Sequence, residues 1–506
     1  MKKFLSLFLA LVMMAALVPA AMAEETITII WHTTKETYEN SLATNPDTTF
    51  DAVWSVVPAF EEKYGVKVDV RAVAWGDMLS TAVSMVNNGE SVDLVQANDQ
   101  SFPVYPARNM LLPISDYLEY MPNFMSRWDK ETLDLFRASD GKLYMLPNMR
   151  DVGYGAIFFR NDWMENLGIE YPKTLDDYYN MLYAFRYNDP DGNGQNDTWG
   201  CVTEGAGSFQ LFSAPFGLPL NCWLVEDGEL YWSDVHPRMK EALEFGAKIF
   251  ADGIAPVEYL TMTSTEAEQL VCNGLAGAWQ TVSSANARRM IALREVDTDA
   301  TSAVLEVPTA EGVEKGYVSM SNIVEVTDLG AKSASSAAYI TSSVSDEKAI
   351  KIAQFIDWFY TDEGATTLTY GVEGLSYNMV DGKPELTEEY QNLDALRSLG
   401  AWDGFDGWGY IEQRSAWHYM WDEEACTNMG NTSITALPQE IYWSTPLYEE
   451  LGSELAAKRK EVFAQVLGGV YTVDEGWDLW MSEFDRIGGN DMVDEMRAEY
   501  AKRNAQ

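Results

Sequence analysis

Short apolar runs alternate with amphipathic stretches along the first part of the chain. The runs TITIIWHTT, VKVDVRAV and DLVQAND are typical of strands, while residues 51–64 and 76–88 carry the 3.6-residue period of helices. This alternation predicts βαβ units and a mostly parallel sheet, in which ligands bind beyond the carboxyl ends of the strands. The rule selects Trp31, His32, Asp99 and Gln100 as candidate ligand-binding residues, although each could instead be a loop residue or a helix cap.

The stretch GKLYMLPNMRDVGYGAIFFRND, residues 141–162, indicates a crossing between two sheets. We expect two strands, KLYMLP and YGAIFFR, with a polar insert at residues 148–151, because Pro147 limits the first run and two glycines loosen the second. A ligand cleft forms at such a crossing. Arg150 and Asp151 offer hydrogen-bond donors and acceptors that suit a polyhydroxylated ligand, and the alternative is a surface ion pair of little energetic value.

Helix and strand patterns continue to alternate in the middle of the chain. We expect helices at 172–185, capped by Thr174, and at 238–251, then a helix, a strand and a second helix within 263–290. Trp279 closes that strand, where it either stacks on a ligand or packs under the following helix. A strand is expected at 303–308 and a polar loop at 309–316, near a second crossing.

Residues 335–343 predict a strand and residues 345–374 a strongly periodic helix. Ser345 and Lys348 have the SxxK spacing of an acylating serine, but a helix cap explains Ser345 better because no second catalytic motif accompanies it.

From residue 381 the composition changes. Residues 400–421 are dense in large aromatic side chains that follow neither a helical nor a strand face, which indicates a partly exposed patch over the cleft or, alternatively, the core of a second lobe. The candidate ligand-binding residues there are Trp402, Trp408 and Trp417. The tail, residues 461–506, is expected to form amphipathic helices packed on that lobe.

The acidic segment DPDGNGQNDTWG, residues 189–200, is the sharpest motif. Oxygen-bearing side chains alternate along it, with glycines that allow tight turning, and Ca²⁺ takes six to eight oxygen ligands. Gly194 occupies the sixth position of an EF-hand, but the twelfth is Gly200, so the usual bidentate glutamate is missing and the Thr198 region or water must complete the shell. We expect a structural Ca²⁺ site, the alternative being a turn without metal, with the ligands Asp189, Asp191, Asn193, Gln195 and Asp197.

The length, net charge and tryptophan content of the chain limit the classes of partner that it is expected to bind. The 506 residues are enough for two to four domains, and a net charge of −43 argues against nucleic acid and anionic membrane surfaces and favours a neutral ligand. The 17 tryptophans suggest flat apolar platforms or simply large cores.

Residues 1–23 have the lysines, apolar run and small-residue end of a secretory signal peptide, so we expect the mature chain to work outside the cytoplasm. No cysteine near residue 24 offers a lipid-anchor site. The four cysteines allow a disulfide, Cys201 with Cys222 being the most local pair, or buried free thiols.

Four segments in this order resemble the extracellular solute-binding proteins of family 1, the carbohydrate receptors of ABC importers. They are NNGESVDLVQANDQSFPVYPARNMLLPI, GKLYMLPNMRDVGYGAIFFRNDWMENLG, NGLAGAWQ and DEKAIKIAQFIDWFYTDEGATTLTYGVEG. The acidic loop is similar to the calcium loop of the large oligosaccharide-binding branch, which includes alginate-binding receptors.

The resemblance implies an α/β periplasmic-binding-protein fold with two hinge-connected lobes, each a mostly parallel sheet flanked by helices. We expect residues 24–149 with about 317–375 in the first lobe, and 150–316 with about 376–506 in the second. It also implies a monomer that closes over a carbohydrate and delivers it to a membrane permease, with Asp99, Gln100, Arg150, Asp151 and Trp279 at sugar-contacting positions. The family's anionic-sugar branch uses basic clefts, so the acidity of this chain speaks against a uronic acid ligand.

Two other classes compete. A secreted carbohydrate-active enzyme would also line a cleft with carboxylates and tryptophans, but no HExxH or GxSxG motif or histidine cluster supports catalysis, so we expect no enzyme. A surface adhesion or scaffold protein would bind no small ligand and would not close.

Overall fold

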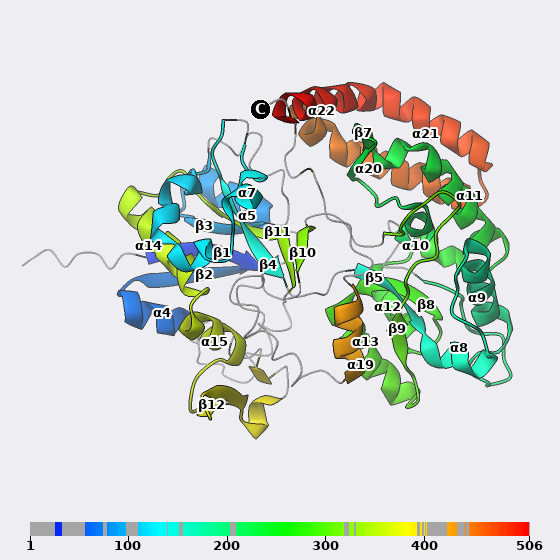
Figure 1. Ribbon diagram of the computed structural model, residues 1–506, viewed down its shortest axis with the longest axis horizontal. Helices are drawn as coiled ribbons and strands as arrows, with labels where there is room; N and C mark the ends of the chain where they lie inside the picture. The colour runs from blue at the N-terminus through cyan, green and yellow to red at the C-terminus, as the bar shows by residue number, and fades with distance from the viewer. Residues whose placement is uncertain are drawn as a thin grey trace, which may run out of the picture.

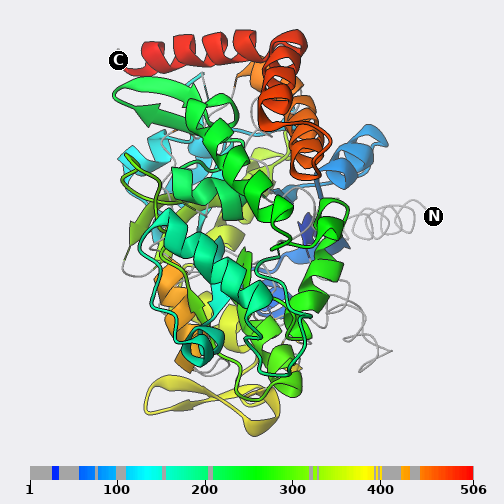
Figure 2. The ribbon, with the colours of Figure 1, turned by 90° about the vertical axis from the view of Figure 1, so that its right-hand side faces the viewer.

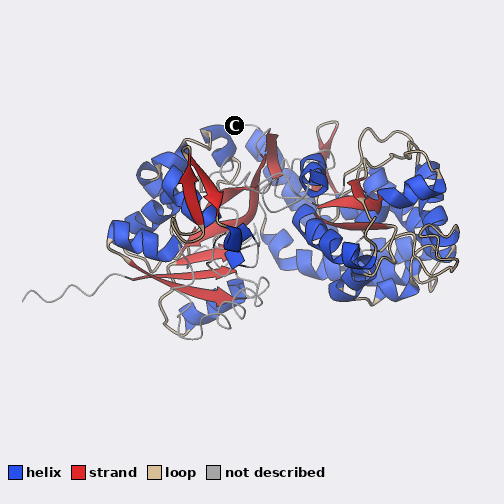
Figure 3. Ribbon diagram, turned by 90° about the horizontal axis from the view of Figure 1, so that it is seen from below, coloured by secondary structure: helices blue, strands red, loops and turns tan. Residues whose placement is uncertain are grey.

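The structure is a computed structural model. It describes residues 26–32, 56–73, 78–97, 110–138, 140–150, 155–202, 209–317, 323–327, 330–391, 395–396, 399, 401, 423–432, 441 and 445–504. Two α/β bodies lie side by side, each with its own sheet and flanking helices (Figures 1 and 3).

The first body is built on a six-stranded sheet of order β10-β11-β3-β1-β2, with β4 also paired to β11. β1 runs parallel to β2 and β3, whereas β11 is antiparallel to β3, β4 and β10. Isoleucine, valine and leucine alternate through β1 and its neighbours and are buried beneath the helices, which places the core against this sheet. The strands are β1 (Thr26–His32), β2 (Lys67–Val73), β3 (Leu94–Ala97), β4 (Met145–Arg150), β10 (Ile323–Thr327) and β11 (Gly330–Ile340).

Helices cover this sheet, and a small hairpin extends from it. α4 contacts β2, α5 contacts β1 and β3, and α15 joins α4 to the hairpin β12–β13. Tyr370 at the end of α15 packs on Tyr377 of the hairpin with ring centroids 5.8 Å apart. The elements are α4 (Val56–Tyr64), α5 (Met78–Asn87), η2 (Ile114–Tyr120), α6 (Pro122–Met125), α7 (Lys130–Asp134), α14 (Asp346–Trp358), α15 (Asp362–Tyr370), β12 (Tyr377–Val380), β13 (Lys383–Leu386) and η6 (Glu388–Gln391).

The second body surrounds a three-stranded sheet of order β8-β5-β9, and a separate hairpin joins β6 to β7. All six residues of β5 are buried, because helices cover both of its faces. The strands are β5 (Gly155–Arg160), β6 (Trp223–Glu226), β7 (Glu229–Trp232), β8 (Ala278–Val282) and β9 (Ser302–Val304).

Helices make up most of the second body, and the last three form a layer along one end of it (Figure 2). Its core draws on residues from Ile157 to Met496, so the C-terminal helices belong to this body. Arg503 in α22 donates a hydrogen bond of 3.4 Å to the carbonyl of Arg137, so the last helix also reaches the first body. The helices are α8 (Asn161–Leu167), α9 (Leu175–Tyr187), α10 (Gln210–Ser213), η3 (Ala214–Phe216), η4 (Ser233–Val235), α11 (Pro237–Ala251), η5 (Val257–Leu260), α12 (Ser264–Cys272), α13 (Ser283–Val296), α19 (Glu423–Asn431), α20 (Pro446–Leu467), α21 (Val473–Ile487) and α22 (Gly489–Asn504).

The predicted two-lobe α/β fold is confirmed, but the prediction of mostly parallel sheets is wrong for the strand pairs that the structure describes. In the second sheet β5 is antiparallel to both β8 and β9, and in the first sheet only the pairs of β1 are parallel. The physical reason differs between the sheets. In the second sheet β5, which arrives from the first body, runs opposite to its neighbours, and in the first sheet the tight β10–β11 connection turns β11 back against β3, β4 and β10. The βαβ periodicity reveals neither arrangement.

The caps predicted for two helices, α9 and α14, are confirmed. Thr174 and Asp177 form the expected capping box of α9, and the Ser345 hydroxyl accepts a hydrogen bond of 3.3 Å from the backbone N–H of Lys348 as the cap of α14. The Lys348 ammonium pairs with buried Asp93 at 2.6 Å, so the SxxK spacing is structural. The helix expected over 345–374 is two helices, α14 and α15.

Cys201 and Cys222 are buried free thiols, as the second of the two alternatives expected. Burial raises the pKa of each thiol to about 12, which keeps both protonated. Within the described residues, no helix is both long enough and apolar enough to span a bilayer.

Candidate functional site

The strands that carry or precede the predicted strand-end residues are neighbours in the first sheet. Trp31 and His32 end β1, which pairs in parallel with β3, and β3 ends at Ala97 just before Asp99 and Gln100. Both strands therefore deliver their carboxyl ends to the same edge. Asp99 and Gln100 lie outside the described residues, and only the backbone of Trp31 and His32 is described, so their ligand contacts stay predictions.

The chain passes from one sheet to the other between residues 150 and 155, as the sequence predicted. The expected polar insert is shorter than predicted, because residues 148–150 continue β4 and pair with β11. Arg150 thus ends a strand of the first sheet, opposite Ala331. Its side chain and the whole of Asp151 lie outside the described part of the structure.

The aromatic segment connects the two bodies in sequence. Before it, Leu396 and Ala401 pack against Leu386 and Tyr390 next to the β12–β13 hairpin of the first body. After it, α19 packs on α13 and β9 of the second body, and the Glu424 carboxylate accepts hydrogen bonds from the backbone N–H of Ser302 at 2.9 Å and from Arg294 at 2.7 Å. The candidates Trp402, Trp408 and Trp417 fall between these anchors and lie outside the described residues.

Trp279 is a core residue in this structure, which corrects its assignment as a stacking residue. Only 1% of its surface is exposed, and it lies opposite Phe158 in the β5–β8 pair. Its indole N–H donates a hydrogen bond of 2.9 Å to the amide oxygen of Asn286 in α13. Neither face is free for a sugar ring, because Phe158, Met290 and Leu293 belong to the same buried cluster. Packing under the following helix, the alternative interpretation, is what the structure shows.

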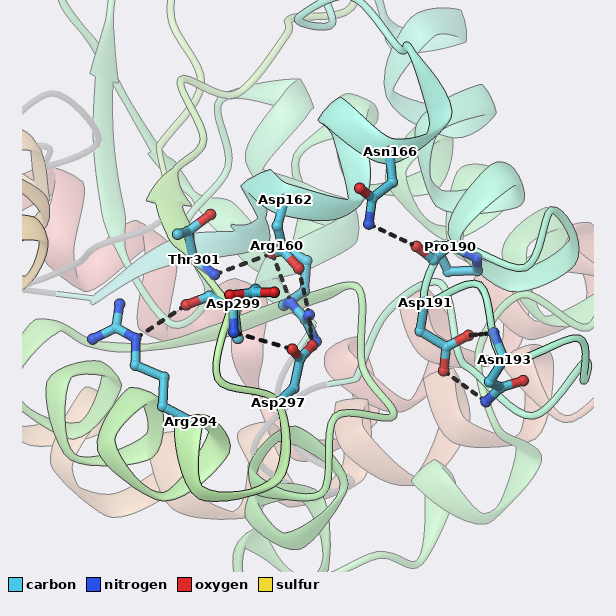
Figure 4. Close-up of polar contacts among 11 residues, drawn as sticks. Arg160, Asp162, Asn166, Pro190, Asp191, Asn193, Arg294, Asp297, Asp299 and Thr301 are labelled. Atoms are coloured by element: carbon cyan, nitrogen blue, oxygen red, sulfur yellow. Dashed lines mark hydrogen bonds and ion pairs between the residues drawn. The ribbon is translucent and has the colours of Figure 1, made fainter.

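The acidic loop has a defined fold at the end of α9. The backbone N–H of Gly194 donates to both carboxylate oxygens of Asp189 at 3.1 Å, and Gly194 has a φ of +76°, a conformation that favours glycine. The Asn166 side chain in α8 donates a hydrogen bond of 3.2 Å to the carbonyl of Pro190 and so fixes the start of the loop (Figure 4).

Carboxylates gather on the inside of this loop. The Asn193 amide nitrogen donates to Asp191 at 2.8 Å (Figure 4). It also donates to Asp197 at 3.3 Å, so it links the two carboxylates. Partial burial and the neighbouring carboxylates of Asp189 and Asp197 raise the pKa of Asp191. Among the described residues, no three His, Cys, Asp or Glu side chains are placed so that they could together hold a metal ion.

The donor set nevertheless fits a hard cation. Three like charges in one loop repel each other unless a cation compensates them, and carboxylate and amide oxygens are the ligands that Ca²⁺ prefers. Rotation of the Asn193 amide would turn its oxygen, now accepting from the backbone N–H of Gln195 at 2.7 Å, toward the two aspartates. The residues that could hold the ion are those predicted from the sequence.

A buried arginine forms ion pairs beside α8, the helix whose Asn166 holds the start of the acidic loop. The guanidinium of Arg160, at the end of β5, pairs with Asp162 at 2.5 Å and with Asp297 at 2.5 Å (Figure 4). It also lies 4.6 Å from the centre of the Trp163 ring. This network joins β5, α8 and the turn after α13. Charge-assisted hydrogen bonds of this kind fix the positions of these three elements relative to one another.

A pocket of about 420 Å³ lies beside the loop that leaves the second body toward β10. The sequence identified this loop as the approach to a second crossing but did not select its residues as a site. Tyr171 fixes one wall, since its hydroxyl oxygen accepts a hydrogen bond of 2.5 Å from the backbone N–H of Glu306. The pocket combines lysine and glutamate side chains with apolar surface, and its lining is Tyr171, Pro172, Lys173, Glu306, Val307, Pro308, Thr309, Glu314, Lys315 and Gly316.

Comparison with known proteins gives the chain relatives over most of its length. A family model described as bacterial extracellular solute-binding protein matches residues 44–366. Lipoprotein LipO of Bacillus subtilis is 29% identical over 410 residues, which cover 76% of each chain. Two solved structures share the fold: the alginate-binding protein AlgQ2 without calcium ion, with a TM-score of 0.70 at 17% identity, and the substrate-binding protein FusA of the S. pneumoniae ABC transporter in complex with kestose, with a TM-score of 0.69 at 17% identity. They cover 95% of this chain and 99% and 100% of their own.

Proposed function

The chain belongs to the family of bacterial extracellular solute-binding proteins, and from this premise we propose that it captures an oligosaccharide between its two lobes and delivers it unaltered to the permease of an ABC importer. The observation that carries the proposal is the family match over residues 44–366 together with a chain that leaves one sheet at Arg150 and enters another at Gly155. In such a protein only the closed form gains the ligand contacts of both lobes, so binding favours closure.

The lobe boundaries are part of this proposal. We place residues 24–150 and about 317–401 in the first lobe, because Arg150 still pairs with Ala331 there, and 155–316 and about 423–506 in the second. The first lobe ends later than the sequence suggested, at about 401 instead of 375, because the β12–β13 hairpin and Ala401 pack with α15 and its neighbours. Residues 402–422 then form the third crossing.

We assign the sugar contacts to the edge of the first sheet where β1 and β3 end and to the crossings between the lobes. Trp31 and His32 end β1, and Asp99 and Gln100 come shortly after the parallel strand β3 in the sequence, while Arg150 and Asp151 stand at the first crossing. Trp402, Trp408 and Trp417 lie in the third crossing and supply apolar ring surfaces. Arginine, aspartate and glutamine would hydrogen-bond hydroxyl groups, while Trp279 is left out because it is buried.

A neutral oligosaccharide is the expected ligand class. FusA is described in complex with kestose and AlgQ2 as an alginate-binding protein, so the fold accommodates both neutral and anionic sugars. The net charge of −43 of this chain repels polyuronates and leaves neutral sugars unaffected. After removal of residues 1–23 the protein would act outside the cytoplasm as a monomer.

A panel of neutral and acidic oligosaccharides tests this function. We expect at least one neutral oligosaccharide to raise the melting temperature and to be recovered intact, because a receptor binds without cleaving. The measurement is a thermal shift followed by mass spectrometry of the released sugar. Cleavage products would indicate an enzyme, and the lack of a shift with every sugar would contradict carbohydrate binding.

We also propose that the loop at residues 189–197 binds Ca²⁺ and that the ion stabilises the fold. AlgQ2 is described in a form without calcium ion, which supports a calcium-binding loop in this branch. At a calcium concentration ten times the dissociation constant, binding to the folded state alone adds about 1.4 kcal/mol of stability. Scanning calorimetry should therefore show a lower melting temperature in EDTA than in calcium, and identical curves would remove the ion from the proposal.

A further inference from the structure

The twelfth position of the acidic loop is closed to any side chain. A Cβ atom at Gly200 would lie 2.2 Å from the carbonyl oxygen of Leu182 and 2.4 Å from a methyl group of Ile254. The backbone of Gly200 is held there by a hydrogen bond of 2.9 Å to the carbonyl of Ile254. A bidentate glutamate at this position is therefore excluded by packing, and the calcium shell must close in another way.

The Thr198 side chain does not close it either. Only 1% of Thr198 is exposed, and its hydroxyl donates a hydrogen bond of 2.7 Å to the carbonyl of Phe185 at the end of α9. This hydroxyl thus points into the helix end and is already used.

Arg186 binds the end of the loop where further oxygen ligands would otherwise be offered. Its guanidinium donates to the carbonyl of Thr198 at 2.8 Å, and to the carbonyl and side-chain oxygens of Asn196 at 3.2 and 3.1 Å. A further bond of 3.1 Å to the carbonyl of Gly253 and stacking at 4.3 Å over Trp199 hold the guanidinium in place. A permanent positive charge therefore lies beside the acidic loop.

We infer that this loop is a weak, water-completed Ca²⁺ site, occupied only at the millimolar calcium concentrations found outside cells. The inference rests on the proposed calcium function and goes beyond it. Calcium affinity in such loops follows the charge and rigidity of the ligand set, and weak extracellular sites have dissociation constants of about 10⁻⁴ to 10⁻³ M. Here the ligand set lacks the twelfth carboxylate, Arg186 opposes the ion, and the protein donors leave about two of seven positions for water. The ion then loads after export and leaves when calcium is depleted.

Two measurements on the intact mature protein test the inference. Isothermal titration with CaCl₂ in buffer stripped of divalent ions should give a dissociation constant of about 0.1 to 1 mM. Bound Tb³⁺, whose luminescence decay in H₂O and D₂O counts coordinated waters, should retain about two or more. Tighter calcium binding than that range, or fewer than two waters, overturns the inference while leaving the calcium site itself intact. No binding of either ion overturns both proposals.

Variants separate the contributions. Arg186→Gln keeps hydrogen-bond donors but removes the charge, so calcium should bind about two- to fivefold more tightly. Arg71→Gln in β2, which removes the same charge from an exposed site in the other lobe, is the matched control and should bind as wild type. Asp191→Asn should abolish binding, whereas Asp227→Asn, in the exposed turn between β6 and β7, should not alter it. Unchanged affinity in Arg186→Gln contradicts the role assigned to the guanidinium.

Discussion

Replacing Arg459 with methionine should lower the free energy of unfolding of the second lobe by about 3 to 5 kcal/mol, because it leaves the Asp234 carboxylate buried without a cation. The two side chains are 5% and 2% exposed, and the guanidinium lies 2.7 Å from the carboxylate. Arg459 also donates to the Asn221 side chain at 3.2 Å, while the Trp480 indole donates to the carbonyl of Asp234 at 2.8 Å. Arg459 therefore links α20 to η4, and Trp480 links α21 to the same element.

Urea denaturation followed by far-ultraviolet circular dichroism measures this effect. The double variant Arg459→Met, Asp234→Asn should recover much of the loss, because it removes the uncompensated charge and keeps a hydrogen-bond acceptor for the backbone N–H of Asn221. The exposed pair of Arg486 and Glu483 in α21 is the matched control, and Arg486→Met should cost at most about 1 kcal/mol. Equal effects at the two sites would show that burial does not control the cost.

Replacing Trp279 with alanine should also destabilise the protein by about 3 to 5 kcal/mol, because it empties a volume within the core between β5, β8 and α13. The variant should bind an identified oligosaccharide with wild-type affinity at temperatures where it remains folded, since only 1% of Trp279 is exposed.

Thermal unfolding and calorimetric binding of the same preparation decide the role of this residue. Trp279→Phe retains most of the apolar volume but loses the hydrogen bond to Asn286, so it should lose less stability than the alanine variant. If Trp279→Ala instead keeps its melting temperature and loses sugar affinity, the residue contacts ligand and its assignment to the core is wrong.

The features that could be predicted from the sequence depend on residues that lie close together along the chain. The capping pair of Thr174 and Asp177 acts over one helical turn, and the alternation of apolar residues in β1 and β2 depends only on which side chains must leave water. The crossing after Arg150 was also predictable, because proline, glycine and a polar run interrupt two apolar strands there. The candidate calcium ligands could be named because they alternate within one loop.

The rest was decided by contacts between distant segments. Trp279 occupies the same position in β8 whether it faces ligand or core, and only its contacts with Phe158 and Asn286 show that it is covered. The antiparallel direction of β5 depends on which body the chain came from, and the closure of the twelfth loop position depends on Leu182 and Ile254. The sequence by itself determined the alternation of strands and helices, the crossing and the acidic loop, because these follow from periodicity and short-range spacing, whereas the two lobes were implied by the resemblance to a known family. Only the tertiary structure decided which tryptophan is buried and what closes the loop, because burial depends on neighbours that the linear chain does not place side by side.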